Sequence, residues 1–522
     1  MKNVLIINPD SMRADSMKHL GNEAAYTPNL DELAKEGVSF RNAFCQNTVC
    51  VPSRCSFMTG LYCHTHGHRT MNYLLRNGED NLFSDMKSNG YYTVSSTRGD
   101  LMDGEDRKYH KACIDEYIKI PKGSKEFGKS YALSRGDKDS DTYYSFLNGS
   151  GVIDSDDVVK NLDDLTVDGA INSIKRRPKD KPFFMFVGIN APHPEYFVEK
   201  KFYDLIDKSK LQPRIPSISK DDGKPKMEKG LRDIMRVGDW DEERLKHLRA
   251  VYLGMCAKVD YLTGLLVDTL KSEGIYDDTM IIFMSDHGDY TGDFGIVEKC
   301  QNCFPDCLTN VPFIIKPCKG ERLDCGVNDN LVELTDMTAT IWEEAGIKPN
   351  FRTQFGNSLF PMMKDESLSL RDVVFCEGGR NPGERMCVEN TREGSPYYAR
   401  HTQEEQEDGR HGKAVMVRSK EFKYVYRLYE QDELYVLSIG ESKNLIEDEK
   451  YAGVVLAMKE KALEWLVRTC DEVPAKRDSR FTNEFMYNNM RAMGASPFVI
   501  LGLKFYFNVL HKSPMDLIKK HI

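Results

Sequence analysis

Short continuous apolar runs alternate with stretches of helical periodicity along most of the chain. Three of the runs, NVLIIN (3–8), FFMFVGIN (183–190) and TMIIFM (279–284), have the length and character of strands that are buried on both faces. Strands that alternate with helices in this way are typical of a mostly parallel sheet with helices packed on its faces. We therefore expect an α/β protein built around one large sheet.

Two of the amphipathic stretches carry clear helix signals. TPNLDELAKEGV offers Thr27 as N-cap, Pro28 in the first turn and Gly37 at its end. A much longer stretch, residues 245–274, places its apolar residues on one stripe and closes at Gly274. These helices should cover the faces of the predicted sheet.

The pattern changes after residue 370, where short alternating segments such as AVMVRS and FKYVYRLY precede a helical segment, AGVVLAMKEKALEWLVRTC. We assign residues 1–370 to the α/β domain and 371–475 to a small antiparallel sheet with a helix packed on it. Residues 476–522 form an aromatic-rich tail that would suit a homo-oligomer contact. The charged stretch 195–245 is either a solvated insertion, which we favour, or a lid over the site.

Composition narrows the class of protein. With 522 residues, 40% of them apolar, the chain can bury a large core without help from disulfides or metals. Its formal net charge is −9 and its basic residues are scattered, which argues against a nucleic-acid surface. An anionic substrate would have to be attracted by a few local cations, for which Arg54 and Lys299 are the candidates.

The first residues and the cysteines indicate a cytoplasmic protein. MKNVLIINPD leads directly into a strand and lacks the apolar core and cleavage site of a signal peptide. Fourteen cysteines in a chain of this length are more typical of free thiols than of a disulfide framework, and CQNC with Cys307 is a weak metal-cluster signal. The apolar segment 498–510 is too short to cross a bilayer and contains Lys504, so we expect no membrane span.

Ionisable side chains follow three of the predicted strands. Asp10 ends the first, His193 follows the second, and Asp286 and His287 follow the third. Ligands of open α/β sheets bind beyond the carboxyl ends of the strands, so we expect these groups to face one crevice. Two carboxylates and an imidazole suit a hard or borderline divalent cation.

A further candidate group lies in CVPSRCSFMTG, residues 50–60. Pro52 suits the first position of a helix, whose free backbone donors would make an anion site. Cys50 stands just before that entrance, and Arg54, one turn in, offers a bidentate fork for a tetrahedral oxyanion.

This last segment resembles the signature of the sulfatases, C-x-P-S-R followed by Leu or Met, Thr and Gly, with Met58 in place of the commoner Leu. Other segments fall in the same order as in that family, among them TPNLDELAKEGVSFRNAF, NAPHPEY, DTMIIFMSDHG and DELYVLSIGESKNL. On these motifs the chain is identified as a member of the sulfatases from residue 2 to about 470, with the tail not covered. The resemblance implies an alkaline-phosphatase-like α/β domain with a small C-terminal sheet domain.

The resemblance also implies a reaction and a set of roles. In the family the signature cysteine is oxidised to formylglycine by a maturation enzyme, so Cys50 would be the precursor of the nucleophile that hydrolyses a small sulfate monoester to alcohol and sulfate. Asp10, Asp286, His287 and an oxygen of modified Cys50 would bind one divalent cation, usually Ca²⁺, with Mn²⁺, Mg²⁺ and Zn²⁺ as alternatives. Three further side chains would stabilise the aldehyde hydrate, contact a sulfate oxygen and protonate the leaving oxygen: Arg54, Lys299 and His193, respectively.

The sequence departs from the family pattern at two places. NPD supplies only Asp10 with certainty where many sulfatases have two adjacent aspartates, and GYYTVSSTRGDL places Arg98 and Asp100 where a lysine and a histidine are common. We assign Arg98 and Asp100 to substrate binding. A phosphonate monoester or phosphodiester hydrolase with the same nucleophile is the alternative activity, and an inactive sulfatase-like scaffold is the alternative of another class. CHTHGH resembles an ordinary family segment, so we expect His66 to be structural rather than a metal ligand.

Overall fold

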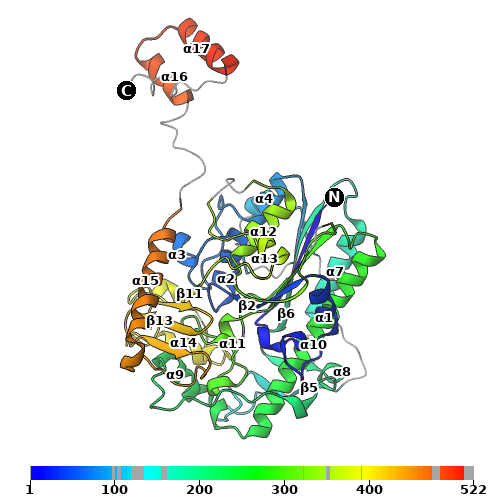
Figure 1. The fold of residues 1–522 in the computed structure, drawn as a ribbon, viewed down its shortest axis with the longest axis vertical. Helices are drawn as coiled ribbons and strands as arrows, with labels where there is room; N and C mark the ends of the chain where they lie inside the picture. Colours follow the sequence, from blue (N-terminus) through cyan, green and yellow to red (C-terminus); the bar gives the residue numbers. More distant parts are fainter. Residues whose placement is uncertain are drawn as a thin grey trace. The chain divides into compact units, whose positions relative to one another are not determined.

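A central eight-stranded sheet carries the fold, with the strand order β10-β2-β9-β8-β1-β6-β3-β4 (Figure 1). Its strands are β1 (Asn3–Asp10), β2 (Val38–Phe44), β3 (Tyr92–Ser95), β4 (Glu116–Tyr117), β6 (Phe183–Pro192), β8 (Thr279–Met284), β9 (Phe313–Lys316) and β10 (Gly326–Glu333). The computed structural model describes residues 2–96, 100–102, 107–118, 135–154, 161–320, 323–348, 353–389, 391–472 and 483–510. β9 runs antiparallel to its neighbours β2 and β8, whereas the other pairs in this sheet are parallel. The predicted mixed, mostly parallel sheet is confirmed.

β1 lies at the centre of the sheet between β6 and β8. Val4, Leu5 and Ile6 pair with Phe184, Met185 and Phe186 of β6 on one side. On the other side the same stretch of β1 is in parallel register with Met280 to Ile282 of β8. Parallel strands end at the same edge, so this register brings the residues after β1, β6 and β8 together.

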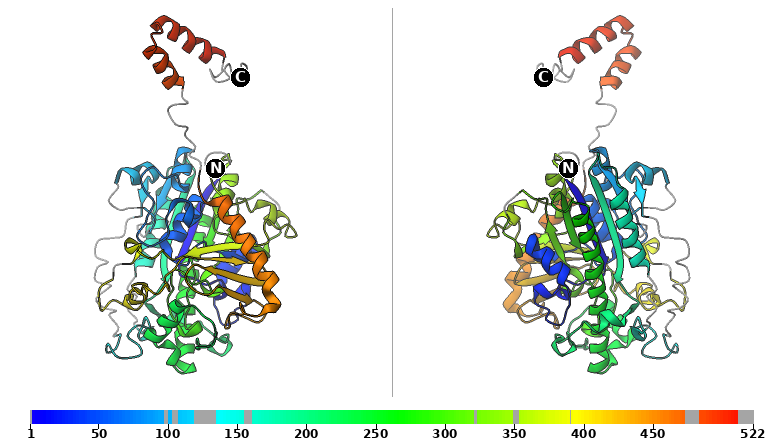
Figure 2. Two further views of the ribbon diagram at one scale, coloured as in Figure 1. Left: turned by 90° about the vertical axis from the view of Figure 1, so that its left-hand side faces the viewer. Right: turned by 90° about the vertical axis from the view of Figure 1, so that its right-hand side faces the viewer.

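Alternate residues of the central strands enter two separate cores. Leu5 and Ile7 of β1 pack in the core formed with α1, α7 and α10, whereas Val4 and Ile6 pack in the core formed with α2, α4 and α12 (Figure 2). Both faces of the sheet are therefore covered, which explains the continuous apolar runs in the sequence. The helices of these two layers are α1 (Pro28–Glu36), α7 (Leu162–Arg176), α10 (Glu242–Ser272), α2 (Cys50–Thr59), α4 (Leu82–Ser88) and α12 (Asp336–Ala345).

The helix ends differ in detail from the sequence prediction. Thr27 does precede α1, but its hydroxyl donates to Asp31 Oδ1 at 3.1 Å and does not cap a backbone N–H. α2 begins at Cys50, so Pro52 is its third residue and not its first. Proline tolerates this position because the first-turn N–H groups have no partner within the helix.

The long helix α10 begins three residues earlier than expected, because the side chain of Asp241 accepts a hydrogen bond from the backbone N–H of Arg244 and caps it. It is long and apolar enough to cross a membrane by composition alone, but 83% of its most apolar window is buried inside the fold. This is the behaviour of a core helix.

A four-stranded antiparallel sheet follows, in the order β11 (Val374–Gly378), β12 (Ala414–Arg418), β13 (Phe422–Arg427) and β14 (Glu433–Val436). α15 (Ala452–Thr469) packs on it and shares a core with Tyr424 and Leu434. A long insertion between β11 and β12 contains α14 (Tyr398–Glu404). The predicted small antiparallel sheet with a helix is confirmed.

The charged stretch 195–245 contains β7 (Tyr196–Glu199), which pairs with β5 (Leu147–Ile153), and the helices α8 (Lys200–Tyr203) and α9 (Lys226–Met235). Lys224 within it is buried and donates to the Tyr435 hydroxyl of the small sheet at 2.9 Å. The segment therefore makes a buried contact with the small sheet.

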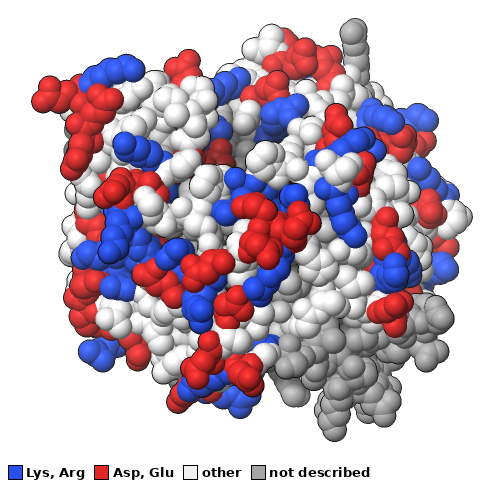
Figure 3. Space-filling view, turned by 90° about the horizontal axis from the view of Figure 1, so that it is seen from below, with Lys and Arg blue, Asp and Glu red and all other residues white. Residues whose placement is uncertain are grey.

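Several short helices complete the part of the chain that is described: α3 (Cys63–His66), α5 (Arg107–Cys113), α11 (Asp306–Thr309) and α13 (Phe360–Lys364). On the face in Figure 3, acidic and basic side chains are interspersed.

α16 (Asn483–Ala492) and α17 (Pro497–Leu510) belong to a separate compact unit, in which Tyr487 and Ile500 are buried and Phe498 and Phe505 are exposed. The tail residues 476–482 and 511–522 lie outside the described part, and the oligomer contact stays a prediction.

Candidate active site

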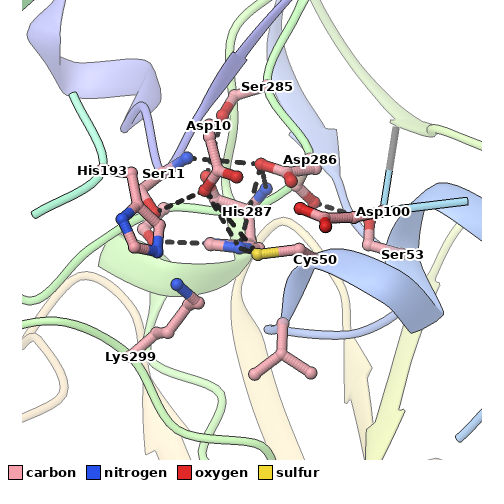
Figure 4. Close-up of polar contacts among 12 residues, drawn as sticks. Asp10, Ser11, Cys50, Ser53, Asp100, His193, Ser285, Asp286, His287 and Lys299 are labelled. Carbon is pink, nitrogen blue, oxygen red and sulfur yellow. Dashed lines mark hydrogen bonds and ion pairs between the residues drawn. The ribbon is translucent and has the colours of Figure 1, made fainter. Parts of the chain in front are cut away.

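Four predicted ligand residues meet at the carboxyl edge of the large sheet (Figure 4). Asp10 is the last residue of β1, Asp286 and His287 follow β8, and Cys50 is the first residue of α2. One ligand atom from each of the four lies within 4.8 Å of the other three, and all four residues are buried. The ends of β1 and β8 therefore bring their ionisable side chains together, as expected from the sequence.

Arg54 joins the two carboxylates of this group. Its Nη2 donates to Asp10 Oδ2 at 2.7 Å and its Nε donates to Asp286 Oδ2 at 2.8 Å. The guanidinium is 1% exposed, so these charge-assisted bonds are shielded from water. Burial alone would lower the pKa of Arg54, but Asp286 and Asp10 raise it above its ordinary value, and the side chain stays charged.

The Oδ1 atoms of the same carboxylates face the other two ligand residues. Asp10 Oδ1 accepts from the Ser11 hydroxyl at 3.0 Å and lies 3.7 Å from both Cys50 Sγ and His287 Nε2. Asp286 Oδ1 accepts from the backbone N–H groups of Ser11 and His287 and lies 3.8 Å from His287 Nε2. Each carboxylate thus gives one oxygen to Arg54 and presents the other to the centre of the group.

The backbone around the first turn of α2 is tied to the same strand end. Ser53 Oγ donates to the backbone carbonyl of Asp286 at 2.6 Å. Because Ser53 and Arg54 both bond Asp286, the start of α2 is held against the loop after β8 at two points. This contact gives the P-S-R part of the motif a structural reason.

Burial governs the chemistry of Cys50. Burial first and the charge of Asp10 second raise the pKa of its thiol well above the ordinary value, and the charge of Lys299 offsets this only in part. The unmodified residue is therefore a neutral thiol at neutral pH, and a neutral thiol is a weak nucleophile.

His193 and Lys299 lie near Cys50, on one side of its sulfur in the view of Figure 4, with Asp100 on the other. Nδ1 of His193 donates to the backbone carbonyl of Pro194 at 2.5 Å, which directs Nε2 away from that carbonyl. The ammonium of Lys299 is buried and forms an ion pair with Glu298 Oε1 at 2.8 Å. The predicted catalytic residues Cys50, Arg54, His193 and Lys299 are thus gathered at one edge of the sheet.

Of the two residues assigned to substrate binding, Asp100 can be placed. Its Oδ2 lies 3.7 Å from Arg54 Nη1, and its side chain is 36% exposed, so it stands at the mouth of the buried group. Arg98 lies outside the described residues.

The donor atoms fit a divalent cation. Two carboxylate oxygens, an imidazole nitrogen and residue 50 converge, and Arg54 already neutralises part of the carboxylate charge. The Nδ1 of His287 donates to the Gly288 carbonyl at 2.9 Å, which leaves the lone pair of Nε2 toward the centre. Cys50 Sγ marks the position from which residue 50 would contribute its ligand atom.

The other metal-like motifs are not part of this group. His64 contacts Glu377 and Thr469, and His66 Nε2 lies 3.2 Å from the Thr59 hydroxyl, which agrees with a structural role. Cys300, Cys303 and Cys307 are buried, free thiols. Among the described residues, the group around Cys50 is the one set of His, Cys, Asp and Glu side chains with metal-binding geometry.

Sequence reasoning missed two buried residues that contact the loop of Lys299. Glu298 adjoins Lys299 in the sequence, but an acidic residue beside a lysine has no distinctive pattern. Arg400 lies about a hundred residues later, within a polar insertion of the small sheet. Its Nη1 donates to Glu298 Oε2 at 2.8 Å, a contact that only the folded chain reveals.

Comparisons with known proteins agree with this arrangement. The chain is 27% identical to a multifunctional alkaline phosphatase superfamily protein of Trinickia caryophylli, over 70% of this chain and 77% of that protein. It is also 27% identical to an arylsulfatase of Clostridium perfringens, over 72% of this chain and 81% of the relative. The solved phosphonate monoester hydrolase of Agrobacterium radiobacter superposes with a TM-score of 0.69 at 22% identity, covering 90% of this chain and 96% of that one, which shows a shared fold.

The family model that matches is Sulfatase, over residues 2–347. These residues contain the large sheet, the four groups around Cys50, and both His193 and Lys299. The chain therefore belongs to the sulfatase family.

Proposed function

We propose that this sulfatase-family enzyme hydrolyses sulfate monoesters to alcohol and sulfate, with a nucleophile made from Cys50. The observation that carries the proposal is the convergence of Asp10, Cys50, Asp286 and His287 within 4.8 Å, with Arg54 bonded to both carboxylates. Residue 50 thus lies at the carboxyl edge of the large sheet, beside a fixed cation and three side chains that could bind a metal. An anionic ester would be activated in such a place.

Two groups that the chain does not itself encode complete the site. Asp10, Asp286, His287 and residue 50 would hold one divalent cation, which would supply Lewis-acid stabilisation of negative charge there. Calcium is our first choice because oxygen atoms would supply three of the four ligands, and Mn²⁺, Mg²⁺ and Zn²⁺ are the alternatives because of the imidazole. Residue 50, oxidised to formylglycine by a maturation enzyme, would supply a hydrated aldehyde with one hydroxyl to attack sulfur and a second that permits release of sulfate.

The chain's own residues then have separate tasks. Arg54 holds the two carboxylates in place and keeps a fixed positive charge next to residue 50. Lys299 binds an oxygen of the sulfate group, since its ammonium is held near Cys50. His193, in its doubly protonated imidazolium form, donates a proton from Nε2 to the leaving alcohol oxygen, while its Nδ1–H stays bonded to the Pro194 carbonyl.

Two measurements test the proposal together. Mass spectrometry of the peptide that contains residue 50, from protein made with a formylglycine-forming partner, should show the aldehyde in place of the thiol. The matured enzyme, assayed with an aryl sulfate and with phenyl phosphonate, should prefer the sulfate. A preference for the phosphonate would assign the alternative activity, and no turnover with residue 50 fully oxidised would favour the scaffold.

A further inference from the structure

α14, in the insertion of the small sheet, sends one buried side chain to the catalytic loop. The side chain of Arg400 is 6% exposed. Its Nη1 donates to Glu298 Oε2 at 2.8 Å and to the backbone carbonyl of Lys299 at 3.4 Å. One guanidinium nitrogen thus contacts both residues of the Glu298–Lys299 pair.

Glu298 links this arginine to the ammonium beside Cys50. Its Oε1 lies 2.8 Å from Lys299 Nζ, while Oε2 is taken by Arg400. The backbone of Glu298 has φ +64°, in the left-handed region that a glutamate rarely adopts. Two hydrogen bonds hold it there: its N–H donates to the Tyr196 hydroxyl and its carbonyl accepts from Tyr290 N–H, both at 3.0 Å.

The charges around Arg400 support a fixed arrangement. Burial would raise the pKa of Glu298, but Arg400 and Lys299 lower it to about 2, so the carboxylate is ionised at neutral pH. Arg400 Nη2 also donates to Glu389 at 2.5 Å. Glu404 lies farther from the guanidinium, with its Oε1 3.9 Å from Arg400 Nε, and burial and the neighbouring Glu389 raise its pKa.

We infer that Arg400 is a positioning residue for Lys299: it anchors the Glu298 carboxylate, which holds the Lys299 ammonium beside residue 50. The inference rests on the proposed function, in which Lys299 binds a sulfate oxygen. Lysine is a point charge on a flexible stem, so its placement depends on a second group. With Oε2 of Glu298 anchored by Arg400 and Oε1 paired with Lys299, the ammonium is held on one side and keeps N–H donors for the substrate.

A double-mutant cycle tests the coupling in the matured, metal-loaded enzyme. Arg400→Met should lower kcat/KM for an aryl sulfate by about 10- to 100-fold, the range expected when a charge-assisted contact is lost. Lys299→Met should lose at least as much, and the double variant should lose no more than Lys299→Met alone, to within about twofold. Losses that multiply would show that Arg400 acts independently of Lys299 and would overturn the inference.

Two controls separate positioning from stability. Arg371→Met breaks another buried ion pair, with Asp336, and should leave kcat/KM within about twofold of the wild-type value. An equal loss in this control would assign the effect to stability and overturn the inference. Glu298→Gln removes the linking charge at nearly constant shape. It should reproduce the loss in kcat/KM seen in Arg400→Met, and combining it with Lys299→Met should cause no further loss. This variant tests the inference even if Arg400→Met folds poorly.

Inorganic sulfate binding, measured by its protection against thermal unfolding, gives a readout that does not need turnover. Its dissociation constant should rise in Lys299→Met and in Arg400→Met, with no further rise in the double variant. If the wild type binds sulfate but does not hydrolyse sulfate esters, the proposed function fails while the binding cycle still decides the role of Arg400. A wild type that neither binds sulfate nor hydrolyses the aryl sulfate would overturn both.

Discussion

The sulfur of Cys50 lies 3.2 Å from Nε2 of His287. A carbonyl can only accept a hydrogen bond, so the contact between Nδ1 and the Gly288 carbonyl places a proton on Nδ1. Burial lowers the pKa of His287, which keeps the ring neutral and leaves a lone pair on Nε2. The imidazole is therefore already in the tautomer that a metal ligand needs, and it is aimed at residue 50.

Cys50 faces Nε2 of His287, and replacing it should abolish catalysis without unfolding the protein. Cys50→Ala should lower kcat by more than about 10³-fold, because no other group can take the place of a lost nucleophile. The matched control is Cys55→Ala, which removes a buried thiol from the same helix outside the site and should keep most of the activity. Substantial turnover by Cys50→Ala would refute the nucleophile assignment.

Asp286→Asn should release the metal. The change keeps the shape of the side chain but removes a charge that faces both Arg54 and the centre of the site, so metal affinity should fall by at least about 10- to 100-fold. Metal content after dialysis, measured by elemental analysis, should fall together with activity. Full metal content in an inactive variant would mean that Asp286 acts in another way.

His193→Gln should be sensitive to the leaving group. A general acid matters most when the departing oxygen is basic, so losses of about 10² to 10⁴-fold are expected for alkyl or poor aryl leaving groups and much smaller ones for nitrophenol. Rates for a series of aryl sulfates of graded phenol pKa provide the measurement. The same loss across the whole series would remove His193 as the acid.

Asp100→Asn should change substrate charge preference. Asp100 stands at the exposed mouth near Arg54, so its negative charge repels an anionic alcohol group and attracts a cationic one. We expect KM to fall about two- to fivefold for a sulfate ester with a carboxylate on its alcohol and to rise by a similar factor for one with a quaternary ammonium. Salt should reduce both effects, and equal KM changes for the two esters would contradict the role.

Asp260→Asn tests how a buried carboxyl outside the active site changes the pH dependence of stability. Burial raises the pKa of Asp260 to about 6 from 3.8, so the folded state binds its proton more tightly than the unfolded state. The contribution of Asp260 to the free energy of unfolding of the wild type should therefore fall by roughly 3 kcal/mol as the pH rises from about 4 to 6. Asp260→Asn lacks this titrating group. Its free energy of unfolding should therefore rise relative to that of the wild type as the pH increases over that window. Urea unfolding at pH 4, 5 and 7 provides the check, and a constant difference would contradict it.

Much of the site could be read from the sequence because each group follows a recognisable local signal. Asp10, His193 and Asp286 come directly after buried apolar runs, and parallel pairing of β1 with β6 and β8 is enough to bring such endings together. Cys50 and Arg54 belong to a short motif whose spacing is fixed by one turn of helix. These signals depend on local periodicity, which a sequence displays directly.

Other features depend on tertiary contacts and left no local signal. The hydroxyl of Thr27 accepts from the backbone N–H of Lys18, outside the helix, donates to Asp31 and does not cap α1. Lys224 lies in a run of charged residues that looked solvated, yet it is buried against Tyr435 of the small sheet. Arg400 reaches Glu298 from α14, in the insertion of the small sheet, and the sequence separation of about a hundred residues hides that pairing.

The burial of α2 also determines when its first residue can be modified. All ten residues of this helix are buried, and Cys50 is 2% exposed behind Asp10 and His287. An enzyme that oxidises residue 50 needs access to its side chain, which the packed helix does not give. If residue 50 is oxidised as proposed, the modification precedes the docking of α2 on the sheet, and a chain that folds first is committed to remaining a thiol.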